Sequence, residues 1–586
     1  MSHETDANDA GSILIASPPA YSFSAAASLT GDGTNNAQTT SMFEKFPVGA
    51  NNLKGIRLLS LLPGVLGSPI ECTMQVASLY GTPDYEALSY TWLEDPSVAG
   101  LQEIEVGSIN TASTEFKPVI QIGGEVFLIQ RNLWWALEYL RRPDEERTLW
   151  VDAVCVDQAN IQERNLQVGH MGEIYRLAKQ VIVWVGREDK HSTALFNFMR
   201  EPSFRKCLPS SEYRIFSGKD IRVYREAFDE FCSRSYWTRL WIVQEIGLAS
   251  KIEIQCGADS ARWEAFTKAG LMFRGDEKLP MRIAQQRIRR RGGSCSLDSL
   301  LKDCGESLCQ DPRDKVYGLL GLVTEGQVLE VDYSKSLFDL FADLVQHKYR
   351  NTAHSATATI VPFVRHLHRM WPELHQFDEK IQRSPRLLDD YSLRGIIRGR
   401  ITRITTATIL SSSTNRSAAW HPKLYRDFPQ ESAVQSFRDM IDRLAQTPRE
   451  DFERIGLMEA STSVISNRQV REFLSMWPLR IFLEEKGQFG VGPSIAKKGD
   501  FLCQFHGSDI AAILRGPPRF NYLPTAGYRI IGRAFVAKRS NEEGWALGSK
   551  QPPKTFRYSV PEESNENRKS TISLEVRLKE LYLLTR

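Results

Sequence analysis

The sequence lacks the short motifs of several common enzyme classes. It has no G-x-x-x-x-G-K-[ST] loop for nucleoside-triphosphate phosphates, no H-E-x-x-H zinc motif and no G-x-S-x-G nucleophile turn. Its nine cysteines include no C-x-x-C pair, and an odd number of scattered cysteines suits a reducing compartment better than a disulfide framework. We therefore expect neither nucleotide hydrolysis by a phosphate loop nor a disulfide scaffold.

The chain also lacks a dominant charge and a long apolar run. Its formal net charge is +3 over 586 residues, which predicts no strong field for nucleic acid. No apolar run reaches the roughly 18 residues that span a bilayer, and the acidic, polar start is unlike a secretory signal. A cytoplasmic protein without a membrane span is expected, and its length predicts about two to four domains.

Four regions can be predicted along the chain. Residues 1–50 have few large apolar side chains, so a disordered leader is expected. Residues 51–260 alternate between apolar strands and helices, which predicts an α/β domain. Residues 261–475 are expected to form a mainly helical extension with linkers. Residues 476–586 have short apolar segments between Gly and Pro turns, which predict a β-rich, mainly antiparallel module.

The first part of the α/β domain is rich in strand signals. Ile56–Leu62 and Glu71–Ala77 are expected to be two strands joined by a Pro/Gly turn. Val119–Ile129 has the pattern of a β-hairpin turned at its two adjacent glycines. Asn132 is expected to cap the helix that follows, which Pro143 would stop.

The most informative stretch begins at Leu149. Leu149–Val156 is mostly apolar, which predicts a buried strand that ends in a polar corner. Asn160 and Glu163 then form a capping-box-like start of a helix, and Val181–Val185 is a second apolar run. These elements describe a βαβ unit, with Ala87–Tyr90 as a neighbouring parallel strand. Polar side chains at the strand ends would lie at a ligand-facing rim.

A later segment combines two tryptophans with a carboxylate. Ser235 can cap a helix on which Trp237, Trp241 and Glu245 are each four residues apart and share one face. A carboxylate in such an apolar, aromatic site is poorly screened and acts strongly on a nearby developing positive charge.

Three blocks of the sequence carry a family resemblance. Tyr85–Trp92, Leu149–Ala178 and Arg234–Glu245, in this order over about 160 residues, resemble the fungal heterokaryon-incompatibility (HET) domain. The family usually has Gly where this chain has Leu93, so the turn there would differ. Asp311–Gly321 is similar to a segment that commonly follows the blocks. The resemblance implies a fungal allorecognition effector that promotes growth arrest or cell death and has a self-associating or allelic protein partner.

HET domains in turn look like relatives of TIR domains, whose fold is a flavodoxin-like parallel sheet. In NAD-cleaving TIR domains, the glutamate of a Trp-x-x-x-Glu motif stabilises the oxocarbenium-like charge at the nicotinamide ribose, and Trp241 and Glu245 match this motif. The resemblance makes Glu245 the candidate catalytic residue and NAD a candidate substrate, with no bound cofactor expected. Tyr90, Trp92, Asp157 and Trp241 become candidates for substrate binding, the first two by stacking on a base or nicotinamide ring.

Each candidate also has a structural interpretation. Glu245 could pair with an arginine such as Arg239 or Arg164 and anchor its helix. Asp157 could cap the next helix, and Asp152 could form a buried ion pair. A non-enzymatic interaction or scaffold module that assembles with partner proteins is therefore the alternative function.

Other reactive side chains favour structural roles. Cys155 lies inside an apolar strand, where a buried thiol is inert. His366 and His368 have no third ligand at a recognisable spacing, so no metal site is predicted. The arginine-rich stretch Arg282–Arg291 is interpreted as a solvated helix and linker rather than a phosphate-binding patch.

Overall fold

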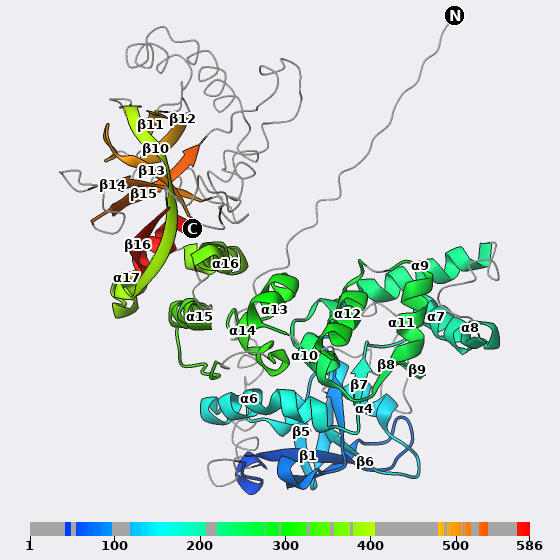
Figure 1. Cartoon of the computed structure of the whole chain (residues 1–586). Coiled ribbons are helices and arrows are strands. Elements are labelled where there is room, and N and C mark those ends of the chain that lie inside the picture. Colours follow the sequence, from blue (N-terminus) through cyan, green and yellow to red (C-terminus); the bar gives the residue numbers. More distant parts are fainter. Residues whose placement is uncertain are drawn as a thin grey trace, which may run out of the picture. The chain divides into compact units, whose positions relative to one another are not determined.

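The chain forms two compact units (Figure 1). Met1–Ser294 and Ser307–Leu322 belong to the first unit, and Cys295–Glu306 and Val323–Arg586 belong to the second. The structure is a computed structural model. It describes residues 42–48, 54–96, 118–206, 219–275, 277–324 apart from 292 and 294, 329–351, 357–375, 379–404, 479–516 apart from 486–488, 494, 506, 507 and 509, 527–536, and 571–585.

The first unit extends beyond residue 260, the predicted end of the α/β domain, to include two further helices and the returning segment 307–322. Its strands are β1 (Gly55–Leu61), β2 (Glu71–Ser78), β3 (Glu86–Ser89), β4 (Val119–Ile122), β5 (Glu125–Leu128), β6 (Arg147–Trp150), β7 (Gln180–Trp184), β8 (Ile252–Cys256) and β9 (Asp259–Arg262). Its α-helices are α4 (Arg131–Leu140), α5 (Asp152–Cys155), α6 (Ile161–Leu177), α7 (Lys190–Arg200), α8 (Pro202–Lys206), α9 (Lys219–Ser233), α10 (Trp241–Leu248), α11 (Trp263–Met272), α12 (Leu279–Arg291) and α14 (Asp314–Tyr317). The short 3-10 helices η1 (Leu79–Gly81), η2 (Ser235–Thr238) and η3 (Leu320–Leu322) complete it.

A nine-stranded sheet organises this unit, in the order β5-β4-β2-β1-β6-β3-β7-β8-β9. Its centre consists of four parallel strands, since β3 pairs in parallel with both β6 and β7, and β7 with β8. Numbered along the chain, these four have the order 2-1-3-4, which is the order of flavodoxin-like folds. The predicted parallel neighbours are therefore confirmed. The strand order reverses between β3 and β7, where ligands bind in such sheets.

Strand β3 is fixed to helix α6 by two tyrosines. The hydroxyl of Tyr85 donates to the carbonyl of Ile174 (2.6 Å), and the hydroxyl of Tyr175 donates to the carbonyl of Leu88 (3.2 Å). Both tyrosines are fully buried, so their hydroxyls need these partners. These two hydrogen bonds therefore fix the position of β3 along α6.

The strand predicted over Leu149–Val156 is shorter than expected. It ends at Trp150 because the carboxylate of Asp152 accepts from the backbone N–H of Ala153 (2.8 Å), and Cys155 N–H bonds back to the Val151 carbonyl (2.7 Å). These contacts turn the chain into the short helix α5. The predicted strand is wrong beyond Trp150.

The predicted starts of two helices differ from the structure in part. Asn132 lies inside α4 and donates to Thr91 rather than capping the helix. Asn160 does cap α6, as predicted, but the side chain of Glu163 does not close a capping box. It forms a buried bidentate ion pair with Arg57 (2.5 and 3.0 Å) and accepts from the backbone N–H of Asp157 (2.8 Å). This pair ties β1 to α6.

The remaining predicted strands near the start of the domain agree with the structure. Strands β1 and β2 are antiparallel, and β4 and β5 form a hairpin turned at Gly123 and Gly124, both with positive φ. Residues 42–48, by contrast, belong to the predicted leader, and yet Met42 and Phe43 are buried, with the Arg57 guanidinium 4.8 Å above the Phe43 ring. The leader boundary at residue 50 therefore differs from the structure, while residues 1–41 lie outside the described residues.

The second unit contains a seven-stranded sheet in the order β11-β12-β15-β14-β13-β10-β16, with all pairings antiparallel. Its strands are β10 (Asp390–Ile404), β11 (Leu479–Glu484), β12 (Phe489–Pro493), β13 (Phe501–Phe505), β14 (Ala511–Arg515), β15 (Arg529–Val536) and β16 (Thr571–Arg577). Its helices are α13 (Leu297–Cys304), α15 (Leu337–Asn351), α16 (Thr357–Met370), η4 (Pro372–His375), α17 (Glu379–Gln382), η5 (Pro385–Leu388) and α23 (Leu578–Thr585).

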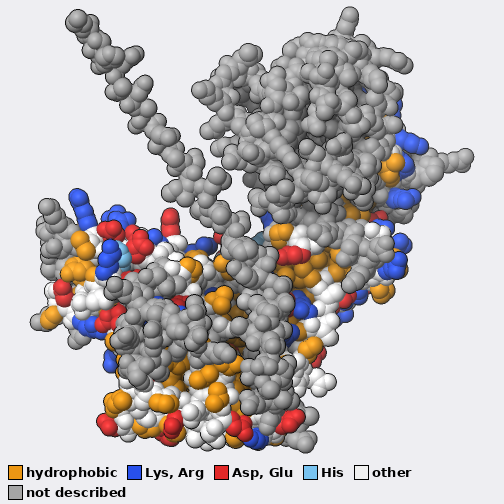
Figure 2. Space-filling model, turned by 180° about the vertical axis from the view of Figure 1, so that it is seen from behind, with side chains coloured by type: hydrophobic (Ala, Val, Ile, Leu, Met, Phe, Trp, Pro, Cys, Tyr) orange, Lys and Arg blue, Asp and Glu red, His pale blue; other side chains and the backbone are white. Residues whose placement is uncertain are grey.

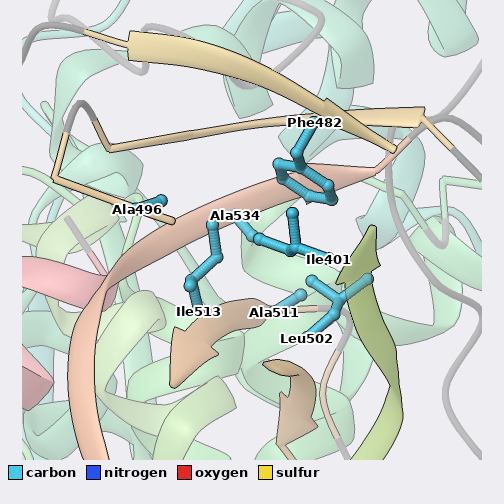
Figure 3. Packing of buried hydrophobic residues seen from close by; sticks show 7 residues of the cluster. All are labelled: Ile401, Phe482, Ala496, Leu502, Ala511, Ile513 and Ala534. Carbon is cyan, nitrogen blue, oxygen red and sulfur yellow. The ribbon is translucent and has the colours of Figure 1, made fainter. Parts of the chain in front are cut away.

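Strand β10 was not predicted, since it lies in the stretch expected to be mainly helical. Its arginines and glycines hide the alternation of buried Tyr391, Leu393 and Gly395. Gly395 is needed because an added Cβ would lie 2.3 Å from the sulfur of Cys503 on β13. Strands of this sheet enclose a small apolar core (Figure 3) of Ile401, Phe482, Ala496, Leu502, Ala511, Ile513 and Ala534.

The described surface carries mixed charges. On the face seen in Figure 2, Lys and Arg side chains lie interspersed with Asp and Glu, in keeping with the net charge of +3. Among the described residues, no helix is both long and apolar enough to cross a membrane.

Candidate active site

Glu245 lies on α10 and is 2% exposed. Its carboxylate accepts a hydrogen bond from the hydroxyl of Ser89, the last residue of β3. The Ser89 hydroxyl is also 2.6 Å from the hydroxyl of Tyr236 in η2. Glu245 therefore lies at the carboxyl end of β3, beside the point where the strand order reverses.

Arg239 forms an ion pair with this carboxylate. Its Nη1 lies 4.0 Å from Glu245 Oε2 and donates to the carbonyl of Tyr90. Burial raises the pKa of Glu245 to about 7, although Arg239 and the Ser89 hydroxyl both act to lower it. Near neutral pH, Glu245 thus exchanges between the acid and the carboxylate.

Asp152 provides a second carboxyl group in the same region. It accepts from the indole Nε1 of Trp92 (3.0 Å) and is hydrogen-bonded to the hydroxyl of Tyr90. Burial raises the pKa of Asp152 against the opposing effects of Arg239 and Trp92. Burial would lower the pKa of Arg239, but Glu245 and Asp152 together raise it. The Arg239 guanidinium therefore interacts electrostatically with the carboxyl groups of both Glu245 and Asp152.

The loop after β3 is held on several sides. Asn132 of α4 donates to the carbonyl (2.6 Å) and hydroxyl (2.9 Å) of Thr91. Glu94 pairs with Arg187 (2.9 Å), and Asp95 accepts from the backbone N–H of Ser235 (2.5 Å). Such anchoring fixes the positions of Tyr90 and Trp92 relative to Glu245.

Comparison with known proteins identifies the domain that carries this site. Residues 85–245 match the family described as Heterokaryon incompatibility protein (HET). The chain is a HET-domain protein. A curated relative from Neurospora crassa, named Heterokaryon incompatibility protein 6, OR allele, is 26% identical over 341 residues, or 48% of this chain and 49% of the relative. The chain thus spans about half the length of this relative. No solved structure matches the chain.

Within the HET domain, the candidates from the sequence have different surroundings. Tyr90, Trp92, Asp152 and Arg239 are linked by hydrogen bonds, and the ion pair with Arg239 connects Glu245 to this group. The Glu245–Arg239 contact is the ion pair that the structural interpretation of Glu245 predicts.

Asp157 and Trp241 make other contacts. The carboxylate of Asp157 accepts from the backbone N–H groups of Ala159 (3.0 Å) and Asn160 (3.3 Å), which shapes the turn before α6. The indole of Trp241 donates to Asp314 (3.2 Å). The assignment of both residues to substrate binding stays a prediction.

The predicted helix carrying two tryptophans and the carboxylate is wrong. Trp237 lies in η2 and stacks on Phe266 at 5.5 Å, whereas Trp241 begins α10. The two elements are separate because the backbone around Arg239 pairs with Leu308 instead of continuing a helix. Glu245 is therefore surrounded by hydroxyl groups and a guanidinium rather than by two indoles.

Sequence reasoning did not single out Ser89 or Tyr236. Both residues lie inside the HET blocks, next to Tyr90 and Trp237. Their position in these blocks was the sequence feature that could have identified them as site residues. The exposed Leu93, in place of the usual Gly, has no positive φ, since Thr82 and Arg274 are the non-glycine residues with positive φ in the described chain. Its turn requires no glycine.

The remaining reactive side chains have structural surroundings. Burial raises the pKa of the Cys155 thiol to about 12, which keeps it protonated. A ring nitrogen of His366 lies 3.1 Å from the Leu301 carbonyl, and the His368 ring packs against Phe341 and Tyr582. Among the residues that the structure describes, no cluster of three or more His, Cys, Asp or Glu could hold a metal ion.

Proposed function

We propose that this HET-domain protein is a cytoplasmic effector of heterokaryon incompatibility that promotes growth arrest or cell death together with an allelic or self-associating protein partner. We further propose that its HET domain cleaves the N-glycosidic bond of NAD or a related nucleotide, with Glu245 as the catalytic residue. The family match and the name of the Neurospora crassa relative support the biological role. The 2-1-3-4 order of the parallel strands supports a TIR-like domain.

One observation carries the chemical proposal. A buried carboxyl group, with its pKa raised to about 7, lies at the end of β3 where the sheet order reverses. Structural carboxylates in ion pairs usually have lowered pKa values. A carboxyl pKa that is raised by burial beside a specific charged partner is typical of functional sites.

The reaction uses the charged form of Glu245. The C–N bond between the ribose and nicotinamide breaks, and its electron pair leaves with nicotinamide. The ribose carbon becomes oxocarbenium-like, and the carboxylate stabilises this charge strongly because little water screens it. A water oxygen then bonds to the ribose carbon, and its proton passes to Glu245 and on to solvent. NAD and water thus yield ADP-ribose, nicotinamide and one proton.

A second candidate function is a non-enzymatic interaction module. The favouring observation is that Glu245 already contacts Ser89 and Arg239 within the domain. In this case the polar group would hold β3, η2 and α10 together, and the surface of the domain would assemble with partner proteins.

Nicotinamide release from NAD tests the proposal. The purified full-length chain should be incubated with NAD at concentrations high enough for self-association. Glu245→Gln keeps the shape and hydrogen bonding but removes the charge. Glu145→Gln, the same change at a side chain that is 69% exposed, is the matched control.

The two functions predict different results. Enzymatic function predicts that wild type and Glu145→Gln release nicotinamide and are toxic on overexpression, whereas Glu245→Gln folds but has neither property. Toxicity of Glu245→Gln equal to that of wild type would rule out a mechanism based on this charge. Unfolding of Glu245→Gln would instead assign the carboxylate to the fold.

A further inference from the structure

The helix that carries Glu245 is too short to set its own position. Helix α10 comprises eight residues, and isolated helices of this length are marginal in water. The position of the Glu245 carboxylate therefore depends on what packs against α10 and against the residues just before it.

Segment 307–322, which lies beyond the residues that match the family, pairs with the backbone around Arg239. The N–H of Leu308 donates to the carbonyl of Thr238 (2.7 Å), and the N–H of Leu240 donates to the carbonyl of Leu308 (2.8 Å). These two hydrogen bonds enclose Arg239, the residue that pairs with Glu245.

The same segment contacts two side chains of α10. Buried Asp314 accepts from the indole of Trp241 (3.2 Å), and the buried amide of Gln244 accepts from the N–H of Gly321 (3.0 Å). An added Cβ at Gly321 would lie 2.7 Å from Gln244 Oε1 and 3.0 Å from the Cα of Gly172 on α6. Only glycine permits this close approach without displacement of a neighbour.

The other end of α10 has a separate anchor. Arg287 of α12 donates to the carbonyls of Ile246 (2.6 Å) and Ser250 (3.3 Å). A cation at this end also complements the helix dipole. Both ends of α10 are thus fixed by parts of the chain that follow the matched region.

We propose that residues 307–322 are a positioning element of the Glu245 site, which sets the place of Arg239 and Glu245 without contacting substrate. The inference rests on the proposed function for its consequence in catalysis. Its geometric content can be measured without any substrate.

Two pairs of variants of the full-length chain test the inference. Leu308→Pro removes the N–H that bonds to Thr238, whereas Leu308→Ala keeps it and trims only a side chain that is 56% exposed. Asp314→Ala removes the acceptor for Trp241, and Asp314→Asn restores one.

The readout is the ionisation of Glu245, followed as the protonated-carboxyl band in infrared pH titrations and assigned by its absence in Glu245→Gln. Loss of the Arg239 contact should raise the midpoint by about one pKa unit or more, a tenfold change in the equilibrium. We expect this rise in Leu308→Pro and Asp314→Ala. Leu308→Ala and Asp314→Asn should have the wild-type midpoint.

A wild-type midpoint in folded Leu308→Pro and Asp314→Ala would overturn the inference. If neither variant folds, Trp241→Phe decides, because it removes the indole N–H donor while it keeps an aromatic ring, and an unchanged midpoint there would overturn the inference as well. Absence of nicotinamide release from wild type would refute the proposed function but leave the infrared comparison valid, so the two failures can be distinguished.

Discussion

The raised pKa of Glu245 predicts how the unfolding free energy of the protein depends on pH. Burial raises the pKa from an ordinary 4.5 to about 7. A carboxyl group with a higher pKa in the folded state binds its proton more tightly there, so it contributes stability below pH 4.5 that is lost as the pH rises toward 7. At 1.36 kcal/mol per pKa unit, this loss amounts to about 3 kcal/mol above neutral pH.

Glu245→Gln isolates this contribution because glutamine does not titrate. The unfolding free energy of the variant minus that of wild type should rise by about 3 kcal/mol between about pH 4.5 and pH 8, and most of this rise should occur below pH 7. Urea unfolding of the full chain, followed by tryptophan fluorescence, measures the difference, since eight of the 12 tryptophans precede residue 295. Glu145→Gln should show no such trend.

A constant difference between Glu245→Gln and wild type across this pH range would refute the reasoning. It would mean that Glu245 has the same pKa in the folded and unfolded chain. A difference that decreased with pH would mean that the ion pair with Arg239 outweighs burial.

Three further predictions concern the contacts around the site. Arg57→Met leaves the buried carboxylate of Glu163 without its bidentate partner and should cost about 3–5 kcal/mol in urea unfolding; a loss below 1 kcal/mol would contradict this. Ser89→Ala removes a hydrogen bond that lowers the pKa of Glu245, so the infrared midpoint should move to higher pH, and a fall would contradict it. Gly321→Ala places a methyl 3.0 Å from the backbone of α6 and should cost about 1–3 kcal/mol in thermal unfolding.

The parallel strands could be predicted because their signal is local. Strand β7 is a continuous apolar run, and β8 alternates between buried and half-buried residues. The early end of β6 could not be predicted, because the chain turns at Asp152, whose carboxylate also accepts hydrogen bonds from Trp92 and Tyr90, which lie 60 or more positions earlier. Local pattern gives the element type, whereas distant partners set its boundary.

The candidate site was predictable in part for the same reason. A motif resemblance pointed to Glu245, and Tyr90 and Trp92 were candidates because their aromatic rings, in the loop after β3, can stack on a base or nicotinamide ring. Ser89 and Tyr236 take part through hydroxyl groups, which leave no periodic mark in a sequence. The pairing of Arg239 with Leu308 breaks the expected helix, and its partner lies far downstream.

The return of the chain at residues 307–322 has a consequence for synthesis on the ribosome. Leu322, the last residue of this segment, is added roughly 80 residues after Glu245, which takes about 4–15 s at typical elongation rates. Until Leu308 and Asp314 are added late in this interval, the nascent chain contains Ser89 and Arg239, which contact the Glu245 carboxylate, but not the strand partner of Arg239 or the acceptor for Trp241. The domain is therefore completed only after translation has continued well past Glu245.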